Sequence, residues 1–348
     1  MKSKNYSENI IKVFKKDGFI LSEPDVLLDS DYIIQRSGEN FRKLMFTFDD
    51  DAGKSMCLRP DLTVAYCIKY LKDNSKVNAK IFYSGQAYRR SNSLKDKVIN
   101  DQLGIEILGS KNKSSDDLKI LKTITNSIKK IKIKNTSIKV GDVSLFKNLI
   151  ESLKMPERWK MRLKRHFWRP QYFEDLLTRL ETNSDIDPTA VDVDKKKFSE
   201  MKNLNQSNKI ANRKVSEILS RFDRKIKDPR SFVENKKIVG VIREFLKINC
   251  SIDKLEKTLK SFVKKNKLGK NIFKDISTIK NLSKINSKTT FSINFGRDIE
   301  YYTGIVFEIY NSSKKEIARG GRYDGLLKSL GSKKNISAVG AAINLNNL

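Results

Sequence analysis

A long helical segment separates two segments with strand patterns, and this interruption limits the architectures that the chain can adopt. Between about residues 115 and 284, helical periodicity and lysine dominate, and the only glycines are Gly141, Gly240 and Gly269. On either side, runs such as Lys80–Arg89 and Ile305–Tyr310 are typical of β-strands. The pattern predicts one α+β core, formed by residues 1–145 and 286–348, with a mostly helical insertion at 146–285.

Local signals within the two core segments predict several individual elements. Apolar residues at helical spacing predict a helix over Tyr6–Asp17, which Gly18 ends. A polar turn between two short apolar runs predicts a hairpin that ends at Leu58. Asp61 is expected to cap a helix over Leu62–Leu71, because a side-chain oxygen at this position can accept from a free backbone N–H.

The amino-acid composition disfavours several classes of protein, but it does not identify the function. The chain of 348 residues has 71 Lys+Arg against 41 Asp+Glu, but lysine recurs in almost every segment. We therefore attribute the net charge of +30 mainly to compositional bias, and nucleic acid is not the expected partner. A single histidine, His166, and three cysteines without a CxxC pair disfavour zinc sites and histidine-based triads. We expect a cytoplasmic protein that has no metal and no membrane span.

Four motifs, in a fixed order, carry a resemblance to a known family. The motifs are Leu58–Thr63, Gly85–Arg89 with Gln102–Glu106, Gly296–Glu308, and Arg319–Leu326. They are similar to motifs in the catalytic domain of class II histidyl-tRNA synthetases, and most similar to those of its non-charging paralogue, the ATP phosphoribosyltransferase regulatory subunit. The resemblance covers residues of about 1–145 and 286–348, and it implies an antiparallel sheet flanked by helices.

The resemblance implies which residues line an amino-acid pocket on that sheet. Asp61 takes the place of a glutamate, and Thr63 matches a threonine of the family. Arg89 matches the arginine of motif two, and Gln102 and Glu106 match polar residues of the following strand. Carboxylates can hold an ammonium group, and arginine can bind a carboxylate through two parallel hydrogen bonds. Taken singly, each of these residues could instead be an ordinary surface or strand position.

The second half of the pocket is expected from the C-terminal motifs. Arg297 lies at the position of the arginine that contacts histidine in the family. Tyr302 and Tyr323 match tyrosines that line the side-chain pocket, and Tyr301 completes the candidate set. Buried aromatic residues are also common in cores without any ligand. The sequence Asp298-Ile299-Glu300 departs from the family motif, which leaves the identity of the ligand open.

Other departures from the synthetase pattern concern ATP and tRNA. Ser91 stands where a glutamate helps to hold ATP, and Asn347 stands where an arginine clamps the phosphates. The loss of such a phosphate contact can remove several kcal/mol of transition-state stabilisation. The sequence also ends at Leu348, without the anticodon-binding domain that follows in synthetases. We therefore expect that the chain does not aminoacylate tRNA.

Two further segments have open or structural interpretations. Residues 156–170 combine both tryptophans and the only histidine with several basic residues. Trp159, Leu163 and Phe167 have helical spacing, which favours packing or a protein contact, although basic and aromatic residues also suit single-stranded nucleic acid. The pair Gly320-Gly321 lacks the spacing of a phosphate loop and is expected to allow a tight turn.

The resemblance implies a protein without catalytic residues and without a cofactor. It implies the regulatory subunit of a glycosyltransferase complex, which activates a short-form ATP phosphoribosyltransferase catalytic subunit in the first step of histidine biosynthesis. Histidine is the expected ligand and signal, and a homodimeric core within a hetero-oligomer is the expected assembly. Two alternatives remain open, a truncated synthetase-like enzyme that activates an amino acid and an RNA-binding module.

Overall fold

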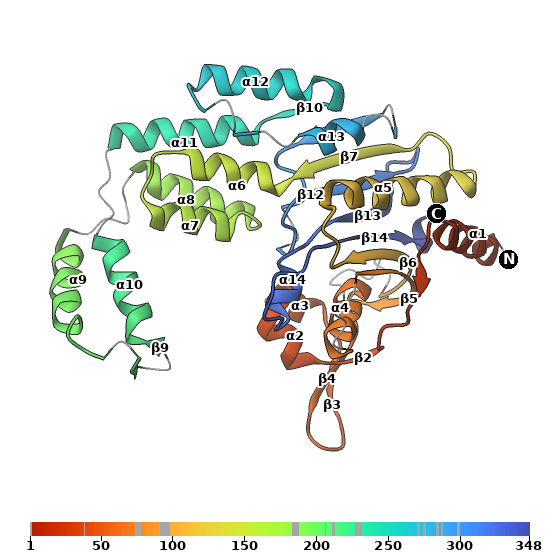
Figure 1. The fold of residues 1–348 in the computed structure, drawn as a ribbon, viewed down its shortest axis with the longest axis horizontal. Coiled ribbons are helices and arrows are strands. Elements are labelled where there is room, and N and C mark those ends of the chain that lie inside the picture. The colour runs from red at the N-terminus through yellow and green to blue at the C-terminus, as the bar shows by residue number, and fades with distance from the viewer. Residues whose placement is uncertain are drawn as a thin grey trace. The chain divides into compact units, whose positions relative to one another are not determined.

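The computed structural model divides the chain into two compact units (Figure 1). Unit 1 comprises residues 1–144, 249–259 and 274–348, and unit 2 comprises residues 145–248 and 260–273. Residues 249–259, within the range where we expected only an insertion, belong to unit 1. The structure describes residues 2–37, 39–73, 78–90, 98–182, 188–205, 207–210, 213–226, 232–269, 272–273, 276–282, 285–286, 288–297 and 300–348.

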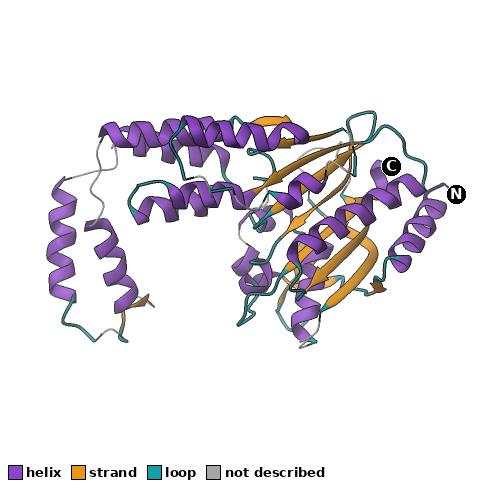
Figure 2. Cartoon of the chain, turned by 45° about the horizontal axis from the view of Figure 1, so that its top comes forward, coloured by secondary structure: helices purple, strands orange, loops and turns teal. Residues whose placement is uncertain are grey.

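A mixed sheet is the centre of unit 1 (Figure 2). Its described residues form nine strands in the order β1-β5-β6-β14-β13-β12-β7-β11-β10. The strands are β1 (Ile20–Leu21), β5 (Ala79–Tyr88), β6 (Ile99–Leu108), β7 (Ser137–Asp142), β10 (Asn249–Ser251), β11 (Thr289–Ser292), β12 (Ile305–Tyr310), β13 (Glu316–Arg322) and β14 (Ala338–Asn344). The strands from β5 to β7 in this order pair antiparallel, as predicted.

Two pairs at the edges of this otherwise antiparallel sheet are parallel, a detail that the sequence did not indicate. β1 pairs parallel with β5, and β11 pairs parallel with β7. Parallel neighbours need a long crossover connection, and the chain between β7 and β11 includes the whole of unit 2. β10 pairs antiparallel with β11 and extends the sheet from within the range that we predicted to be a helical insertion.

Helices cover the sheet, and buried apolar residues explain their positions. They are α1 (Lys2–Lys16), α4 (Leu62–Lys72), α5 (Lys113–Lys130), α13 (Ser277–Leu282) and α14 (Leu326–Ser329), with the short helices η1 (Ile252–Lys254) and η2 (Leu345–Asn347). In α1, Ile10 and Phe14 lie one turn apart and are fully buried. Gly18 follows the helix with a φ of +84°, which glycine adopts without a steric penalty.

The predicted hairpin is part of a small second sheet in unit 1. This sheet has the order β2-β4-β3, and β3 pairs antiparallel with β4 across a polar turn. Its strands and adjacent helices are β2 (Leu27–Asp29), α2 (Ser30–Ser37), α3 (Glu39–Leu44), β3 (Thr47–Asp49) and β4 (Ser55–Leu58). β4 leads directly into the segment that begins α4, so the hairpin precedes the first site residues.

A buried ion pair links β13 to α5. The Nε atom of Arg322 donates to Oδ1 of Asp117 at 2.8 Å, and Nη1 donates to Oδ1 of Asp324 at 2.9 Å. Arg322 also donates to the hydroxyl of Ser337 and to the backbone oxygen of Lys113. Burial raises the pKa of Asp117 to about 6, although the contact with Arg322 acts in the opposite direction. The network therefore holds α5 against the sheet at the end of β13.

Unit 2 is mostly helical. It contains α7 (Glu157–His166), α8 (Pro170–Thr182), α9 (Pro188–Met201), α10 (Val215–Ile226), α11 (Phe232–Leu246), most of α6 (Val143–Ser152), part of α12 (Leu255–Lys265), and the short strands β8 (Lys209–Ile210) and β9 (Arg213–Lys214). Trp159, Leu163 and Phe167 are buried, and the Phe167 ring stacks on Phe146 at 3.7 Å. The aromatic stripe of residues 156–170 therefore packs inside unit 2, as its helical spacing indicated.

Candidate functional site

A cavity of about 250 Å³ lies on the sheet of unit 1, on the side where the start of α4 meets the strands. Side chains from β5, β6, β13, β14 and the segment before β12 complete its wall. The lining residues are Asp61, Thr63, Tyr83, Arg89, Asn100, Gln102, Tyr301, Tyr302, Glu316, Arg319, Gly320, Tyr323, Gly340, Ala341, Ala342 and Asn344. The cavity thus combines carboxylates, arginines and tyrosines in a small space.

The beginning of α4 fixes Asp61 and Arg89 at the mouth of this cavity. Asp61 is the N-cap of the helix, and its Oδ1 atom accepts from the backbone N–H of Val64 at 3.0 Å. Its Oδ2 atom lies 3.2 Å from Nη2 of Arg89, whose Nε donates to the backbone oxygen of Pro60 at 2.7 Å. Both side chains are therefore oriented by the helix start. The Arg89 side chain remains 40% exposed, so part of its guanidinium is accessible.

Glu106 lies beneath the lining and is fully buried. Its carboxyl group accepts from the hydroxyl of Thr63 at 2.7 Å, from that of Tyr83 at 3.1 Å, and from that of Tyr323. Gly340 on β14 faces it in the strand register, and a Cβ atom there would lie 1.3 Å from the Glu106 carboxylate. Only glycine leaves room for the carboxyl group at this position.

The buried environment changes the protonation of Glu106. Burial raises its pKa to about 8, although the hydrogen bonds from Tyr323 and Thr63 lower it. Burial also raises the pKa of Tyr83, Tyr301 and Tyr323 well above the ordinary value, so these hydroxyls remain donors. A cation close to Glu106 would favour the ionised carboxylate, because opposite charges stabilise each other at short range. The cluster can therefore respond to a ligand that carries an ammonium group.

A second charged network forms the wall on β13. Arg319 contacts Glu308, and its Nη2 atom lies 3.0 Å from Glu316. The Tyr310 hydroxyl donates to the other oxygen of Glu308. Burial raises the pKa of Glu316, and the neighbouring Arg319 opposes this shift. Since strand side chains alternate, Arg319 and Arg322 point to opposite faces of the sheet, and Arg319 points to the cavity.

The structure describes all nine predicted site residues and brings most of them together. Asp61, Thr63, Arg89, Gln102, Tyr301, Tyr302 and Tyr323 line the cavity, and Glu106 is bonded to two of them. Arg297 does not line it. Its side chain is buried, and it donates from Nη1 to Oδ1 of Asn294. Asp298, Ile299 and Ser91 lie outside the described residues, so their predicted roles stay predictions.

Several lining residues were not predicted, and a glycine is a sequence signal for one of them, Tyr83. Arg319 lines the cavity together with Tyr83, Asn100, Glu316 and Asn344. A Cβ atom on Gly104 would lie 2.3 Å from the Tyr83 ring, so this glycine makes room for that tyrosine.

The expectation of a tight turn at Gly320-Gly321 was wrong, because both residues lie inside β13. A Cβ atom on Gly320 would lie 2.3 Å from that of Ala341, so close strand contact explains the glycine.

A comparison with known protein families shows to which family this chain belongs. The sequence pattern of the family described as "Histidyl-tRNA synthetase" matches residues 1–222 and 191–348, which together span the chain. The chain belongs to the histidyl-tRNA synthetase family. This membership and the sheet described above confirm the predicted α+β, class II synthetase-like fold.

Curated members of this family are similar to the chain over nearly its whole length. A protein of Brucella anthropi named "ATP phosphoribosyltransferase regulatory subunit" is 26% identical, over 94% of this chain and 92% of the relative. A protein of Allorhizobium ampelinum with the same name is 25% identical, over 97% of this chain and 95% of the relative. The predicted resemblance to the regulatory-subunit branch of the family is thereby confirmed.

Solved structures show the same fold. A protein of Bacillus halodurans, described as an ATP phosphoribosyltransferase regulatory subunit/histidyl-tRNA synthetase, has a TM-score of 0.66 and 17% identity. The similarity covers 99% of this chain and 77% of that protein. The histidyl-tRNA synthetase of a Nostoc species has a TM-score of 0.62 and 14% identity, with 99% and 70% of the two chains covered.

Asn347, which we expected at the position of an ATP-clamping arginine, has a structural role here. Its side-chain Nδ2 atom donates to the backbone oxygen of Glu316 at 2.7 Å, so it links η2 to the start of β13. Among the described residues, no cluster of three or more His, Cys, Asp or Glu side chains is arranged to hold a metal ion. Within the same residues, no helix has the length and apolar character that spanning a bilayer requires.

Proposed function

We propose that this family member is a non-catalytic regulatory subunit that activates a short-form ATP phosphoribosyltransferase in the first step of histidine biosynthesis. The observation that carries the proposal is the similarity, over at least 94% of the chain, to curated relatives named as that regulatory subunit. Asn347 supports the non-catalytic part, because an amide bonded to the backbone of Glu316 supplies no charge for ATP phosphates.

The cavity on the sheet suits a zwitterionic amino acid, and we propose histidine as its ligand. The ammonium group would lie toward Glu106 and Gln102, where a buried carboxyl group is already held by three hydroxyls. The carboxylate would bind the accessible part of Arg89, which Asp61 and Pro60 hold in place. The imidazole ring would lie among Tyr301, Tyr302 and Tyr323. Arg89 therefore takes the role that we had expected of Arg297.

The first test measures the activity of the purified chain alone and its effect on the catalytic subunit. The purified chain is expected to show no histidine-dependent ATP–pyrophosphate exchange, because the Asn347 amide, which is bonded to the backbone of Glu316, carries no positive charge for the phosphates. Added in equimolar amount to the short-form catalytic subunit of the same organism, it is expected to raise phosphoribosyl transfer about 5-fold or more, a typical allosteric coupling. Robust exchange would favour the synthetase-like enzyme, and unchanged transfer would contradict the regulatory role.

The second test concerns the ligand. Tyr323→Phe removes the hydroxyl that donates to Glu106 and is expected to weaken histidine binding by about 1–3 kcal/mol, since it leaves a buried carboxyl group with one bond fewer. Isothermal titration calorimetry, with the catalytic subunit present, measures the change. Tyr32→Phe is the control, because this tyrosine also donates from its hydroxyl, to the backbone oxygen of Leu330, but does not line the cavity. Equal weakening in both variants would argue against this pocket.

A further inference from the structure

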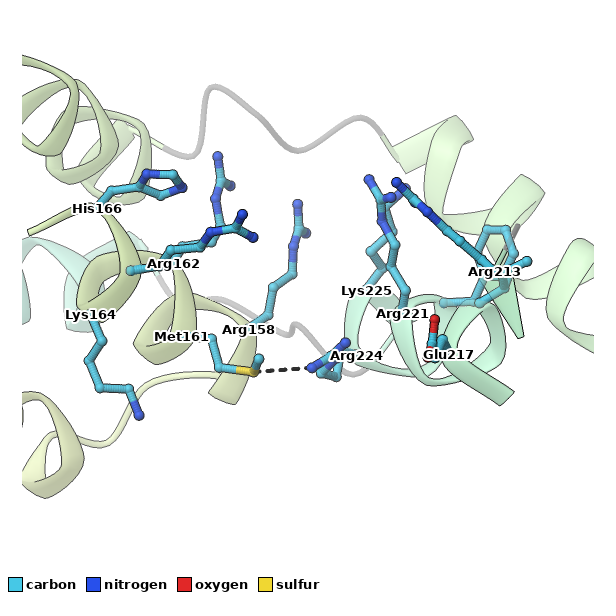
Figure 3. Close-up of a pocket in the computed structure, with 13 residues that line it drawn as sticks. Arg158, Met161, Arg162, Lys164, His166, Arg213, Glu217, Arg221, Arg224 and Lys225 are labelled. Carbon is cyan, nitrogen blue, oxygen red and sulfur yellow. Dashed lines mark hydrogen bonds between the residues drawn. The ribbon is translucent and has the colours of Figure 1, made fainter. Parts of the chain in front are cut away.

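A second, larger cavity lies within unit 2, between α7 and α10, and nothing above assigns it a role (Figure 3). It has a volume of about 940 Å³. Figure 3 shows Arg158 and Arg162 extending from α7, with Arg221 and Lys225 on the facing side. The lining residues are Arg158, Met161, Arg162, Lys164, Arg165, His166, Arg213, Glu217, Ile218, Arg221, Phe222, Arg224 and Lys225.

Arginine is concentrated in this cavity far beyond its share of the sequence. Only 18 of the 71 basic residues of the chain are arginines, and six of those 18 line this cavity. The lysine-rich composition that explains the overall charge therefore does not explain this cluster. Arginine differs from lysine because its planar guanidinium can bind one phosphate or carboxylate through two parallel hydrogen bonds. The cluster thus indicates a site for anionic groups rather than a solvated surface.

Acidic side chains leave much of this charge uncompensated. Glu217 is the only carboxylate among the described residues that line the cavity. The two lysines have partners elsewhere, because Lys164 pairs with Glu151 and Lys225 with Asp194 at 2.9 Å.

Four of the six arginines, Arg165, Arg213, Arg221 and Arg224, have no such ion pair with a described residue. Arg224 donates from Nη1 to the Met161 sulfur at 3.1 Å, which is a weak acceptor, and from Nε to the backbone oxygen of Ser220 at 3.1 Å, so both of these partners are uncharged.

The other lining residues distinguish this cavity from a flat basic surface. Met161, Ile218 and Phe222 contribute apolar side chains, so a ligand could place an uncharged part against them. His166 adds no positive charge at neutral pH, because burial and the neighbouring Arg165 lower its pKa. Its Nδ1 atom is buried and has no hydrogen-bond partner among the described residues. A volume of this size accommodates a small organic ligand, since ligand pockets measure about 300–1,000 Å³.

We propose that this cavity binds a small molecule with two or more adjacent phosphate groups. Several guanidinium groups converge on one open cavity from two helices, and the repulsion between them is relieved when a multiply charged anion lies between them. Adjacent phosphates present several acceptor oxygens within reach of both walls, which a single carboxylate does not. The site is independent of the amino-acid cavity, since its residues all belong to unit 2.

The test uses inorganic tripolyphosphate as the probe and the full chain at about 150 mM salt, where nonspecific phosphate contacts are weakened. Saturable binding by isothermal titration calorimetry is expected. Arg165→Gln/Arg221→Gln is expected to weaken it at least tenfold. Lys236→Gln/Lys237→Gln, a pair of exposed residues on α11 with the same change in charge, is expected to change it less than twofold. Arg165→Lys/Arg221→Lys keeps the charge and is expected to weaken binding about threefold or more.

A comparison of ATP binding with tripolyphosphate binding identifies the kind of molecule that supplies the phosphates. ATP that binds with the same sensitivity to Arg165→Gln/Arg221→Gln would indicate a nucleotide, and tripolyphosphate binding without ATP binding would indicate an inorganic polyphosphate. The proposal is overturned if tripolyphosphate does not saturate the wild-type chain, or if the arginine and lysine variants bind it equally. It is also overturned if a single-stranded RNA of 12 nucleotides binds and tripolyphosphate does not displace it. Should the glutamine variant fail to fold, the lysine variant alone decides.

Discussion

Replacing Arg322 by Met is expected to lower the free energy of unfolding of unit 1 by about 3–5 kcal/mol, the cost of removing one partner of a buried ion pair. Arg322 is 5% exposed and donates to Asp117, Asp324, Ser337 and the backbone of Lys113. Its loss leaves the Asp117 carboxyl buried without its main donor. Because the sheet end and α5 are joined through this side chain, both are expected to open more readily.

Hydrogen–deuterium exchange of peptides from β13, β14 and α5 measures this loss. Tryptophan fluorescence does not, because Trp159 and Trp168 both lie in unit 2. Arg243→Met is the control, since Arg243 also bridges two carboxylates, Glu174 and Glu181, but its side chain is 33% exposed. Exposed pairs contribute about 0–1 kcal/mol. The interpretation is wrong if Arg322→Met costs no more than the control, or if adding Asp117→Asn to Arg322→Met recovers no stability.

Replacing Glu106 by Gln is expected to remove a pH dependence of stability and to stabilise unit 1 at alkaline pH. The folded-state pKa of Glu106 is raised from 4.5 to about 8. Below pH 4.5 both folded and unfolded chains carry the proton, so this group makes no difference. As the pH rises toward 8, the folded state keeps a proton that the unfolded state has released, so the free energy of unfolding falls. Glutamine resembles the protonated carboxyl and does not titrate.

The expected difference between Glu106→Gln and wild type is about 1 kcal/mol or less at pH 5 and grows to at most about 5 kcal/mol at pH 9, since one pKa unit corresponds to about 1.4 kcal/mol. Urea titrations at each pH, with a short deuterium pulse that labels unfolded β6, measure it. Glu8→Gln, which removes an exposed carboxylate from α1, should leave the wild-type pH profile in place. A Glu106→Gln profile parallel to wild type would show that the carboxyl group is already ionised at neutral pH.

Local structure near the site could be predicted because its causes are local. The start of α4 depends on the Asp61 side chain and a backbone N–H three residues later, and both belong to one short segment. The alternation of β6 likewise places Gln102 and Glu106 on one face, whatever the rest of the chain does. Resemblance in ordered motifs then added the expectation that distant tyrosines join them, and the structure brings Tyr301, Tyr302 and Tyr323 to the same cavity.

Tertiary structure decided what depends on neighbours from other parts of the chain. Arg297 and Arg319 are both arginines of C-terminal motifs, yet only Arg319 lines the cavity, because β13 lies beside β14 in the sheet and directs it there. The raised pKa of Glu106 requires burial under strands from three regions, which no local pattern contains. The arginine cavity is lined by residues from α7, β9 and α10, and α7 is about 50 residues away from the other two in sequence. Because basic residues occur throughout the sequence, this cluster could not be predicted from it. By itself, the sequence determined the elements and the family; the packing of distant segments determined which charges meet.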